Sequence, residues 1–200
     1  MFGANVKREL VQELRRNSGF ITSSGATRIG LQRRELTFAV EKGELVRVGR
    51  GLYCTPETWE DEYVISQYRY SSGIFSHETA LYLLDLSDQA PECLTMSFPR
   101  GYNTSPAKHA GILTKSSPAG RHSLGRSLAV TPYGNKVTCY DAERSLCDMV
   151  RGTAAPNLQV LNPAIRAYLS SSKRNIAKLR DYAQALGVAR KIGAYLEMLL

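Results

Sequence analysis

The stretch ITSSGATRIGLQRRELTFAVEKGELVRVGRGLYC, residues 21–54, decides the fold of the first part of the chain. Its residues predict a short helix that begins near Ser23 or Ser24, both good helix N-caps. A second helix is predicted from about Leu31 to Lys42. Gly30 and Gly43 follow the two helices, where a left-handed residue is usually needed. A helix, a tight turn, a helix and a short basic hairpin together are typical of a winged helix-turn-helix.

The hairpin is predicted from alternation, since Arg47 lies between two valines. Gly49-Arg50 has glycine first, which suits a two-residue type II′ turn. Leu52 and Tyr53 would then begin the return strand. This places Arg47 and Arg50 on the wing, within reach of backbone phosphates or the minor groove.

The second helix is predicted to have an inner apolar face, formed by Leu31, Leu36, Ala39 and Val40. Its outer residues gather toward the N-terminal half and are of the types that reach base edges and phosphates in the major groove. These predicted DNA-binding residues are Gln32, Arg33, Arg34 and Thr37. The alternative is a helix pair and hairpin that serve packing or protein contact.

The composition favours a polyanionic partner, because the 200 residues carry a formal net charge of +8. Charge alone does not separate DNA, RNA and an acidic membrane surface. The apolar runs are too short to span a bilayer. The N-terminus, MFGANVKRELVQELRRN, has the pattern of a charged helix rather than of a signal peptide. We therefore expect a cytoplasmic protein without a membrane segment.

The four cysteines are scattered, with no CxxC pair, and this is not zinc-ligand spacing. We expect free thiols that are mostly buried, no metal and no cofactor.

The domain prediction follows from the first helix and the exit from the wing. A helix is predicted over Asn5–Arg16, and Thr55-Pro56-Glu57 marks the end of the wing. Residues 1–57 would form the winged helix-turn-helix domain and residues 58–200 a larger C-terminal domain. The overall class is α/β (α+β), since the second part mixes both patterns. Helices are expected near residues 58–70, 76–86, 141–151, 160–171, 175–186 and 188–199, and strands near 92–98, 112–115, 128–131 and 136–140.

A second basic region is visible between Cys93 and Tyr140, where there is no Asp or Glu. Hydroxyls, amides and long cations are interleaved there, as in phosphate contacts. The alternative is a solvated, loop-rich face without a ligand. The bases of the region are Arg100, Lys108, Lys115, Arg121, Arg126 and Lys136, with His109 and His122.

Signals for catalysis are weak. His77-Glu78 is not followed by the second histidine of a zinc protease motif. Asp141, Glu143 and Asp148 could hold Mg²⁺ in a nuclease. However, Asp141 is a natural helix N-cap, and an acid at Glu143 suits the helix dipole. We expect no enzymatic activity.

Five segments in this order resemble the AbiEi-type antitoxins of bacterial abortive-infection systems, over nearly the whole chain. They are GELVRVGRGLYCTP at 43–56, SHETALYLLDLSDQAP at 76–91, SFPRGYN at 97–103, YDAERSLCDMVR at 140–151 and LRDYAQALGVARKIGAYLEMLL at 179–200. The resemblance implies a winged helix followed by an antitoxin domain.

The resemblance also implies two activities. The protein would repress its own operon by binding inverted repeats in the promoter. It would also counter a neighbouring toxin of nucleotidyltransferase type, without needing a stable complex. DNA reading would fall on Gln32, Arg33, Arg34 and Thr37, with Arg47 and Arg50 on the wing. Antitoxicity would fall on residues from about 60 onward, with Arg100, Tyr102, Lys108, Arg121 and Arg126 as candidate exposed positions. Tyr53, His77, Asp141 and Arg144 also match the family pattern, with structural roles as the alternative.

The leading hypothesis is therefore a DNA-binding autorepressor and antitoxin. One alternative is a transcription regulator whose second domain senses a ligand. The other is a nuclease guided by a winged helix.

Overall fold

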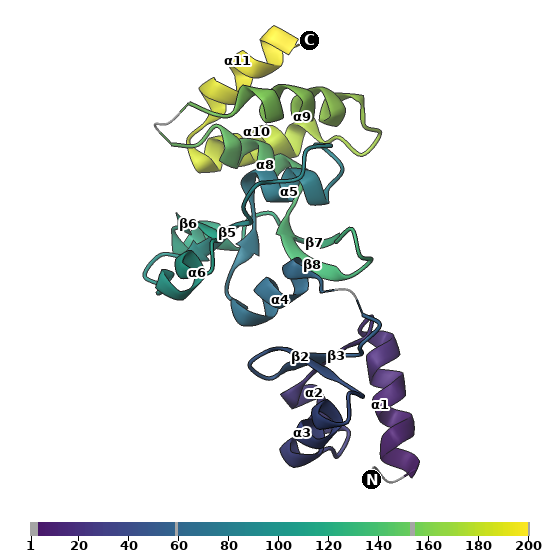
Figure 1. The fold of residues 1–200 in the computed structure, drawn as a ribbon. Helices are drawn as coiled ribbons and strands as arrows, with labels where there is room; N and C mark the ends of the chain where they lie inside the picture. Colours follow the sequence, from purple (N-terminus) through teal and green to yellow (C-terminus); the bar gives the residue numbers. More distant parts are fainter. Residues whose placement is uncertain (1–3, 59, 153–154, 200) are drawn as a thin grey trace. The chain divides into compact units, whose positions relative to one another are not determined.

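The computed structural model describes residues 4–58, 60–152 and 155–199. The chain forms two compact units. The first unit is Met1–Arg69 together with Thr131–Asn135, and the second is Tyr70–Val130 together with Lys136–Leu200. Both units mix helices and strands, which confirms the predicted α/β (α+β) class (Figure 1).

The first unit contains a winged helix-turn-helix, as predicted. Its three strands form an antiparallel sheet in the order β1-β3-β2, and the helices α2 and α3 lie between β1 and the hairpin in the chain. The elements are α1 (Ala4–Arg16), β1 (Phe20–Thr22), α2 (Ser23–Arg28), α3 (Arg33–Glu41), β2 (Val46–Gly49), β3 (Leu52–Cys54) and α4 (Glu62–Arg69).

The helix starts differ from the predictions by one or two residues. The Thr22 hydroxyl, rather than Ser23 or Ser24, caps α2 by accepting a hydrogen bond from the Gly25 N–H at 2.8 Å. Helix α3 begins at Arg33 instead of Leu31, because Gln32 is its N-cap. The Gln32 N–H donates to Glu35 Oε2 at 2.7 Å, so a residue inside the helix fixes its first turn.

The wing turn was predicted wrongly. Gly49 pairs with Leu52, so the two loop residues are Arg50 and Gly51. Gly51 has φ +77°, whereas a type II′ turn needs the positive φ at the first loop residue. A register shift between Arg47 and Gly49 moves the loop forward by one residue.

Helix α4 belongs to the first unit. Val64 and Ile65 pack on the buried cluster of Phe20, Leu52 and Cys54. Because of this packing, the first unit does not end at residue 57 but continues to Arg69. The proposal that residues 1–57 and 58–200 fold as separate domains stays a prediction.

Asp61 explains why the turn at 131–135 is part of the first unit. Its side chain is fully buried, and Oδ1 accepts from the N–H groups of Tyr63 at 2.9 Å and Val64 at 3.2 Å. Oδ2 accepts from Thr131 Oγ1 at 2.6 Å and from Asn135 Nδ2 at 2.8 Å. One buried carboxylate therefore both starts α4 and holds a turn some 70 residues later in the chain.

The second unit contains a five-stranded mixed sheet in the order β6-β5-β4-β8-β7, with helix α5 against it, α8 packed on α5, and α9, α10 and α11 beyond α8 (Figure 1). The β4–β8 and β5–β6 pairs are parallel and the others are antiparallel. The elements are β4 (Ile74–Phe75), α5 (His77–Leu83), β5 (Thr95–Pro99), α6 (Ser105–His109), β6 (Leu113–Ser117), α7 (Ala119–His122), β7 (Arg126–Val130), β8 (Lys136–Tyr140), α8 (Ala142–Met149), α9 (Leu158–Ser170), α10 (Ile176–Leu186) and α11 (Ala189–Leu199).

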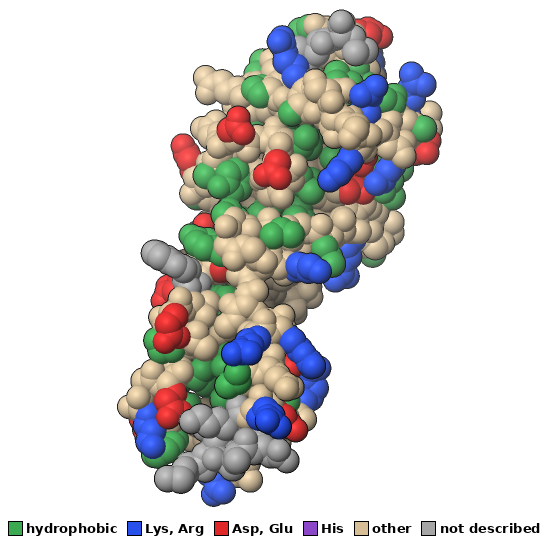
Figure 2. Space-filling model, turned by 90° about the vertical axis from the view of Figure 1, so that its right-hand side faces the viewer, with side chains coloured by type: hydrophobic (Ala, Val, Ile, Leu, Met, Phe, Trp, Pro, Cys, Tyr) green, Lys and Arg blue, Asp and Glu red, His purple; other side chains and the backbone are tan. Residues whose placement is uncertain are grey.

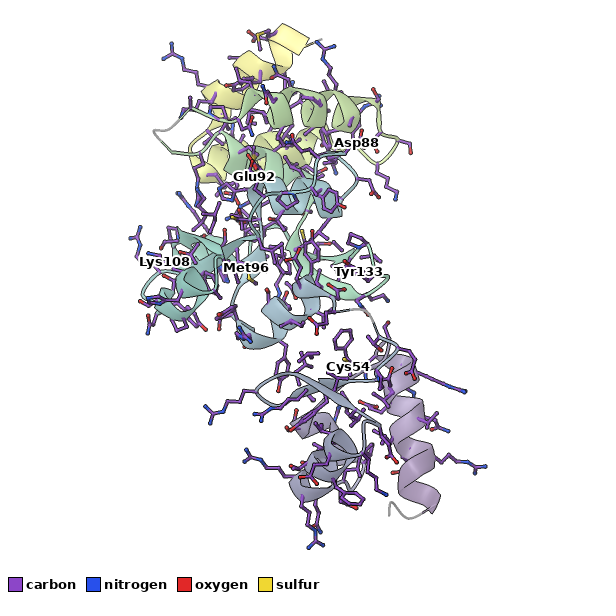
Figure 3. All side chains as sticks on the ribbon, in the orientation of Figure 1. Cys54, Asp88, Glu92, Met96, Lys108 and Tyr133 are labelled. Carbon is purple, nitrogen blue, oxygen red and sulfur yellow. The ribbon has the colours of Figure 1, made fainter. Side chains whose placement is uncertain are left out.

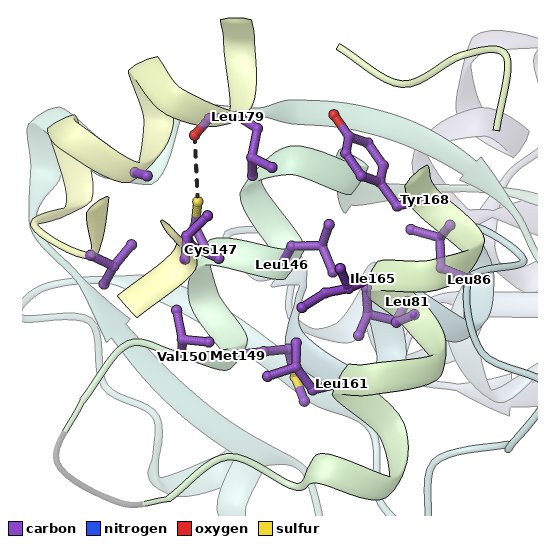
Figure 4. Packing of buried hydrophobic residues seen from close by; sticks show 14 of the residues in the cluster. Leu81, Leu86, Leu146, Cys147, Met149, Val150, Leu161, Ile165, Tyr168 and Leu179 are labelled. Carbon is purple, nitrogen blue, oxygen red and sulfur yellow. Dashed lines mark hydrogen bonds between the residues drawn. The ribbon is translucent and has the colours of Figure 1, made fainter. Parts of the chain in front are cut away.

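The core of the second unit lies among its helices. Leu81, Leu146 and Leu161 are at most 1% exposed and pack together (Figure 4). Cys147 points toward α10, where its thiol donates to the Leu179 carbonyl at 4.0 Å. Cys54, Cys139 and Cys147 are free and buried and Cys93 is free and exposed, in line with the prediction. No helix in the described ranges is long and apolar enough to cross a membrane.

Candidate nucleic-acid interface

Helix α3 presents the predicted DNA-binding residues to solvent. Leu36 and Ala39 are at most 1% exposed and anchor the inner face, as the spacing predicts. Arg33, Arg34 and Thr37 are exposed on the helix, and Gln32 is exposed at its N-cap. The four residues therefore lie together at the N-terminal end of α3.

The two arginines of this face are available to a ligand. In the described part of the chain, neither Arg33 nor Arg34 forms an ion pair with an acidic side chain. Thr37 is partly engaged, since its hydroxyl donates to the Arg33 carbonyl at 3.2 Å. A rigid helix with two free guanidinium groups suits bidentate contacts to guanine or phosphate.

Phe38 is an exposed residue of α3 that the sequence reading left out. It is 41% exposed, and Lys42 Nζ lies 4.5 Å from the centre of its ring. The sequence does hold a signal for its exposure. Phe38 lies four residues after Arg34, one helical turn away, and therefore on the same outer face of the helix. A large apolar ring on this polar face adds a contact that guanidinium groups cannot make.

The wing presents Arg47 and Arg50, both exposed. Its loop is held at Gly51, whose carbonyl accepts from the Ser23 N–H at 2.8 Å and from the Tyr68 hydroxyl at 2.9 Å. These bonds tie the wing to the start of α2 and to α4. Arg47 Nε also donates to the Gly49 carbonyl at 3.3 Å within the wing, whereas Arg50 takes no part in these bonds.

The candidate second basic surface is spread over the second unit. Arg100 and Lys108 are exposed on the β5–α6 segment, where Lys108 lies on the outer side of α6 (Figure 3). Tyr102 is 38% exposed and stacks on Phe98, with the ring centres 5.0 Å apart. Arg121 is exposed on α7, and Arg126 is exposed on β7 at the far edge of the sheet from β6.

The order of the strands divides these five positions into two groups. Arg100 and Tyr102 lie between β5 and α6, and Lys108 and Arg121 lie on α6 and α7, which contact β6 and β5 respectively. Arg126 lies on the other edge, three strands from β5. On the face that Figure 2 shows, lysine and arginine side chains are spread among acidic ones rather than gathered in one patch.

Arg144, by contrast, has a structural place. Its side chain is fully buried, and Nε donates to Asp148 Oδ2 at 2.9 Å. Nη1 donates to the carbonyls of Arg121 at 2.6 Å and Leu124 at 2.7 Å, and the guanidinium lies 4.1 Å from the centre of the Tyr140 ring. Burial raises the pKa of Asp148, against the lowering effect of Arg144.

Two further residues of the family pattern also have structural contacts. Tyr53 is 5% exposed in the core of the first unit. Asp141 caps α8 by accepting from the Arg144 N–H at 2.9 Å, as predicted.

His77 sits in a strained position. Its φ is +54°, and its ring Nδ1 lies 3.0 Å from Ser76 Oγ, which in turn accepts from Ser97 Oγ at 2.9 Å. Burial, followed by the nearby cations Lys115, Arg151 and Arg144, lowers its pKa to about 3. The ring is therefore neutral at physiological pH.

The three carboxylates considered for a nuclease are engaged by cations. Lys178 Nζ lies 2.9 Å from Asp141 Oδ2 and 3.2 Å from Glu143 Oε2. Burial lowers the pKa of Lys178, but the two carboxylates outweigh it and hold the pKa above its usual value. Across the described ranges, no three His, Cys, Asp or Glu side chains are grouped so that they could hold a metal ion.

Glu143 does more than favour the helix dipole. It is 5% exposed and accepts from the Tyr168 hydroxyl at 3.0 Å. The helix dipole is therefore not its whole role, because its removal would take an acceptor from the buried Tyr168 hydroxyl on α9 and an ion-pair partner from Lys178 on α10.

Comparisons with known proteins agree with the geometry of the first unit. Residues 8–56 match the family described as "Transcriptional regulator, AbiEi antitoxin". None of the curated proteins matches the chain. The match spans α3 and the whole wing, and it confirms over these residues the resemblance seen in the sequence.

The fold is shared with a solved structure. The crystal structure of the RV2827C protein from Mycobacterium tuberculosis is similar with a TM-score of 0.55 and 15% identity, over 96% of this chain and 80% of that chain. At this identity the similarity concerns the fold alone. Residues 8–56 are thus similar in sequence to the transcriptional regulators of the AbiEi antitoxin family.

Proposed function

We propose that this protein is an autorepressor that binds inverted repeats in its own promoter, and an antitoxin that counters a toxin of nucleotidyltransferase type. The observation that carries the first half is the free basic face of α3, with Arg33 and Arg34 exposed inside a segment of the AbiEi antitoxin type.

In this proposal, α3 enters the major groove. Arg33 and Arg34 reach base edges or phosphates near its N-terminal end, with Gln32 and Thr37 beside them. Arg47 and Arg50 on the wing contact the backbone or the minor groove. Since charged contacts supply most of the affinity, binding should weaken steeply as salt is added.

Phe38 extends the same proposal to a specific base. Its exposed ring lies next to Thr37 on α3, and apolar side chains in the major groove read the C5 methyl group of thymine. Phe38 would thus select thymine at one position of each half-site.

The antitoxin half of the proposal falls on residues from about 60 onward. The exposed side chains of Arg100, Tyr102, Lys108 and Arg121 at the β5–β6 end of the sheet are its candidate residues, with Arg126 at the other edge. Neutralisation would proceed without a stable complex with the toxin. The resemblance between the sequence segments at 76–91, 97–103 and 140–151 and the AbiEi-type antitoxins supports this half.

The decisive experiment is a gel-shift titration of the full-length protein against the DNA upstream of its own gene, with scrambled DNA as control. We expect specific, salt-sensitive binding. Arg33→Ala and Arg34→Ala should each weaken it by about 1–3 kcal/mol, while Arg166→Ala, which removes an exposed arginine from α9, should not. Equal binding to both DNAs would refute the operator-binding role. Specific binding that neither α3 variant weakens would refute the assignment of the reading helix.

A further inference from the structure

A groove of about 500 Å³ runs between α10 and α11 of the second unit. Helix α10 contributes Ile176, Arg180 and Ala183, which lie four and three residues apart on one stripe. Helix α11 contributes Ile192, Gly193 and Leu196, which also share one stripe. Apart from Arg180, these residues are apolar or small and form the floor of the groove, which has the size of a small-molecule site.

Gly193 keeps this groove open. It lies in the interior of α11, where glycine is among the least favourable residues. A Cβ atom at this position would meet nothing within 4 Å, so packing against the described residues does not explain the glycine. An alanine would be better for the helix, whereas a glycine leaves room for an occupant.

The charged side chains that line the groove indicate which class of ligand it could bind. Arg174 and Arg180 line it and are exposed, and Glu197 is the acidic residue among its lining. Within the described residues neither arginine forms an ion pair, and Arg174 donates only to the Ser171 carbonyl at 3.3 Å. Two unpaired guanidinium groups beside an apolar floor suit a carboxylate on an apolar body, because arginine binds carboxylates bidentately.

We propose that this groove binds a small amphipathic carboxylate, with its apolar chain along Ile192 and Leu196 and its carboxylate on Arg180 and Arg174. Size, apolar floor and unpaired arginines all point to the same ligand class. The inference does not depend on the proposed DNA-binding function, although a ligand in this groove would give the protein a sensory role.

The test uses full-length protein and three probes of equal chain length, each below its micelle-forming concentration. The probes are decanoate, decanol and decyltrimethylammonium, and binding is followed by calorimetry and by NMR of the isoleucine methyl groups. We expect decanoate to bind with shifts at Ile176 and Ile192, and the other two probes to bind at least about tenfold more weakly. Arg180→Ala should remove this preference. Arg190→Ala, which changes an exposed arginine of α11 outside the groove lining, should leave it intact.

Gly193→Leu provides the second test, since leucine points into open space and favours a helix. This variant should keep or raise the unfolding temperature and lose decanoate binding. Equal binding of the three probes, no binding of decanoate, or unchanged binding to Gly193→Leu would each overturn the proposal. So would self-association of the wild type that Gly193→Leu abolishes, because the occupant would then be a second copy of the chain.

Discussion

Phe38 is the residue through which α3 can be tested for base reading rather than mere attraction to phosphate. Deoxyuridine lacks the C5 methyl group of thymine, so its incorporation should weaken binding of the wild type at the thymine that Phe38 meets. The expected loss is about 1 kcal/mol, the value of one buried methyl group. Phe38→Ala should bind more weakly and be indifferent to the same deoxyuridine, and Phe38→Leu should keep part of the sensitivity.

The measurement is a set of titrations with single thymine-to-deoxyuridine replacements across the bound DNA. A replacement that weakens the wild type and Phe38→Ala equally would show that the methyl group is read elsewhere. Arg33 and Arg34 could then still contact the DNA, since their contribution is measured on unmodified bases.

His77 gives the stability of the second unit a predictable pH dependence. Its pKa is lowered from 6.5 to about 3 in the folded protein, by burial first and then by Lys115, Arg151 and Arg144. Between pH 6.5 and 3, His77 is protonated in the unfolded chain and stays neutral in the folded protein. The unfolding free energy therefore falls as the pH falls toward 3. The slope can reach about 1.4 kcal/mol per pH unit.

His77→Asn should flatten this slope in urea unfolding at a series of pH values. Asparagine does not titrate and tolerates the left-handed backbone seen at φ +54°. The raised pKa of Asp148 acts in the opposite direction but is common to both proteins, so it cancels in the comparison. His109→Asn, at an exposed histidine of α6, is the matched control. If His77→Asn has the same slope as the wild type, the protonation of His77 does not contribute to the pH dependence of the unfolding free energy.

At the scale of elements, the wing is the part whose contribution to DNA binding can be separated from that of α3. Arg50 is exposed in its loop, and the loop is held through the Gly51 carbonyl rather than through the arginine. Arg50→Ala should therefore remove a phosphate contact without moving the wing, and should reduce the slope of log K against log salt concentration by about one. Titrations at several salt concentrations measure this slope, with Arg166→Ala as control. A slope identical to that of the wild type would mean that Arg50 does not contact the DNA.

Elements with local signals could be predicted from the sequence. Helix α8 begins at Asp141, whose side chain caps it, and α10 ends at Gly187 with φ +73°. The exposure of Arg33 and Arg34 likewise follows from the 3.6-residue period of α3. In each case the deciding residue lies within a few positions of the feature that it sets.

Elements that depend on partners far away in the chain could not be predicted from the sequence. Strands β1 and β4 have three and two residues, too few for an alternation pattern, and exist because Phe20 pairs with Cys54 and Ile74 with Ser97. The short helices α6 and α7 were missed for the same lack of length. The burial of Arg144 likewise has no local signal in the sequence, because its guanidinium donates to carbonyls 20 and 23 residues away. The wing turn was misplaced because a register shift set by pairing with β3 moved it.

At the scale of the whole molecule, the proposed function assigns repression and antitoxicity to different surfaces. The proposed reading helix and wing lie within residues 8–56, whereas the candidate antitoxic residues lie on the segment between β5 and α6 and on α6, α7 and β7. Full-length variants can therefore separate the two activities while both units are kept. A promoter fusion reports repression, and growth of cells that express the neighbouring toxin from an independent promoter reports rescue.

The combined variant Arg33→Ala, Arg34→Ala and Arg50→Ala should lose most repression and keep full rescue, because its changes are confined to exposed residues of the first unit. Arg100→Ala combined with Lys108→Ala should keep repression and lose rescue, since both exposed cations lie on the β5–α6 segment. Equal cellular amounts of each variant, measured by immunoblot, exclude instability as the cause of a loss.

If the first variant also fails to rescue, antitoxicity requires the DNA-binding face. If the second rescues fully, antitoxicity does not depend on Arg100 and Lys108, and the candidate residues that remain to be tested are Tyr102, Arg121 and Arg126.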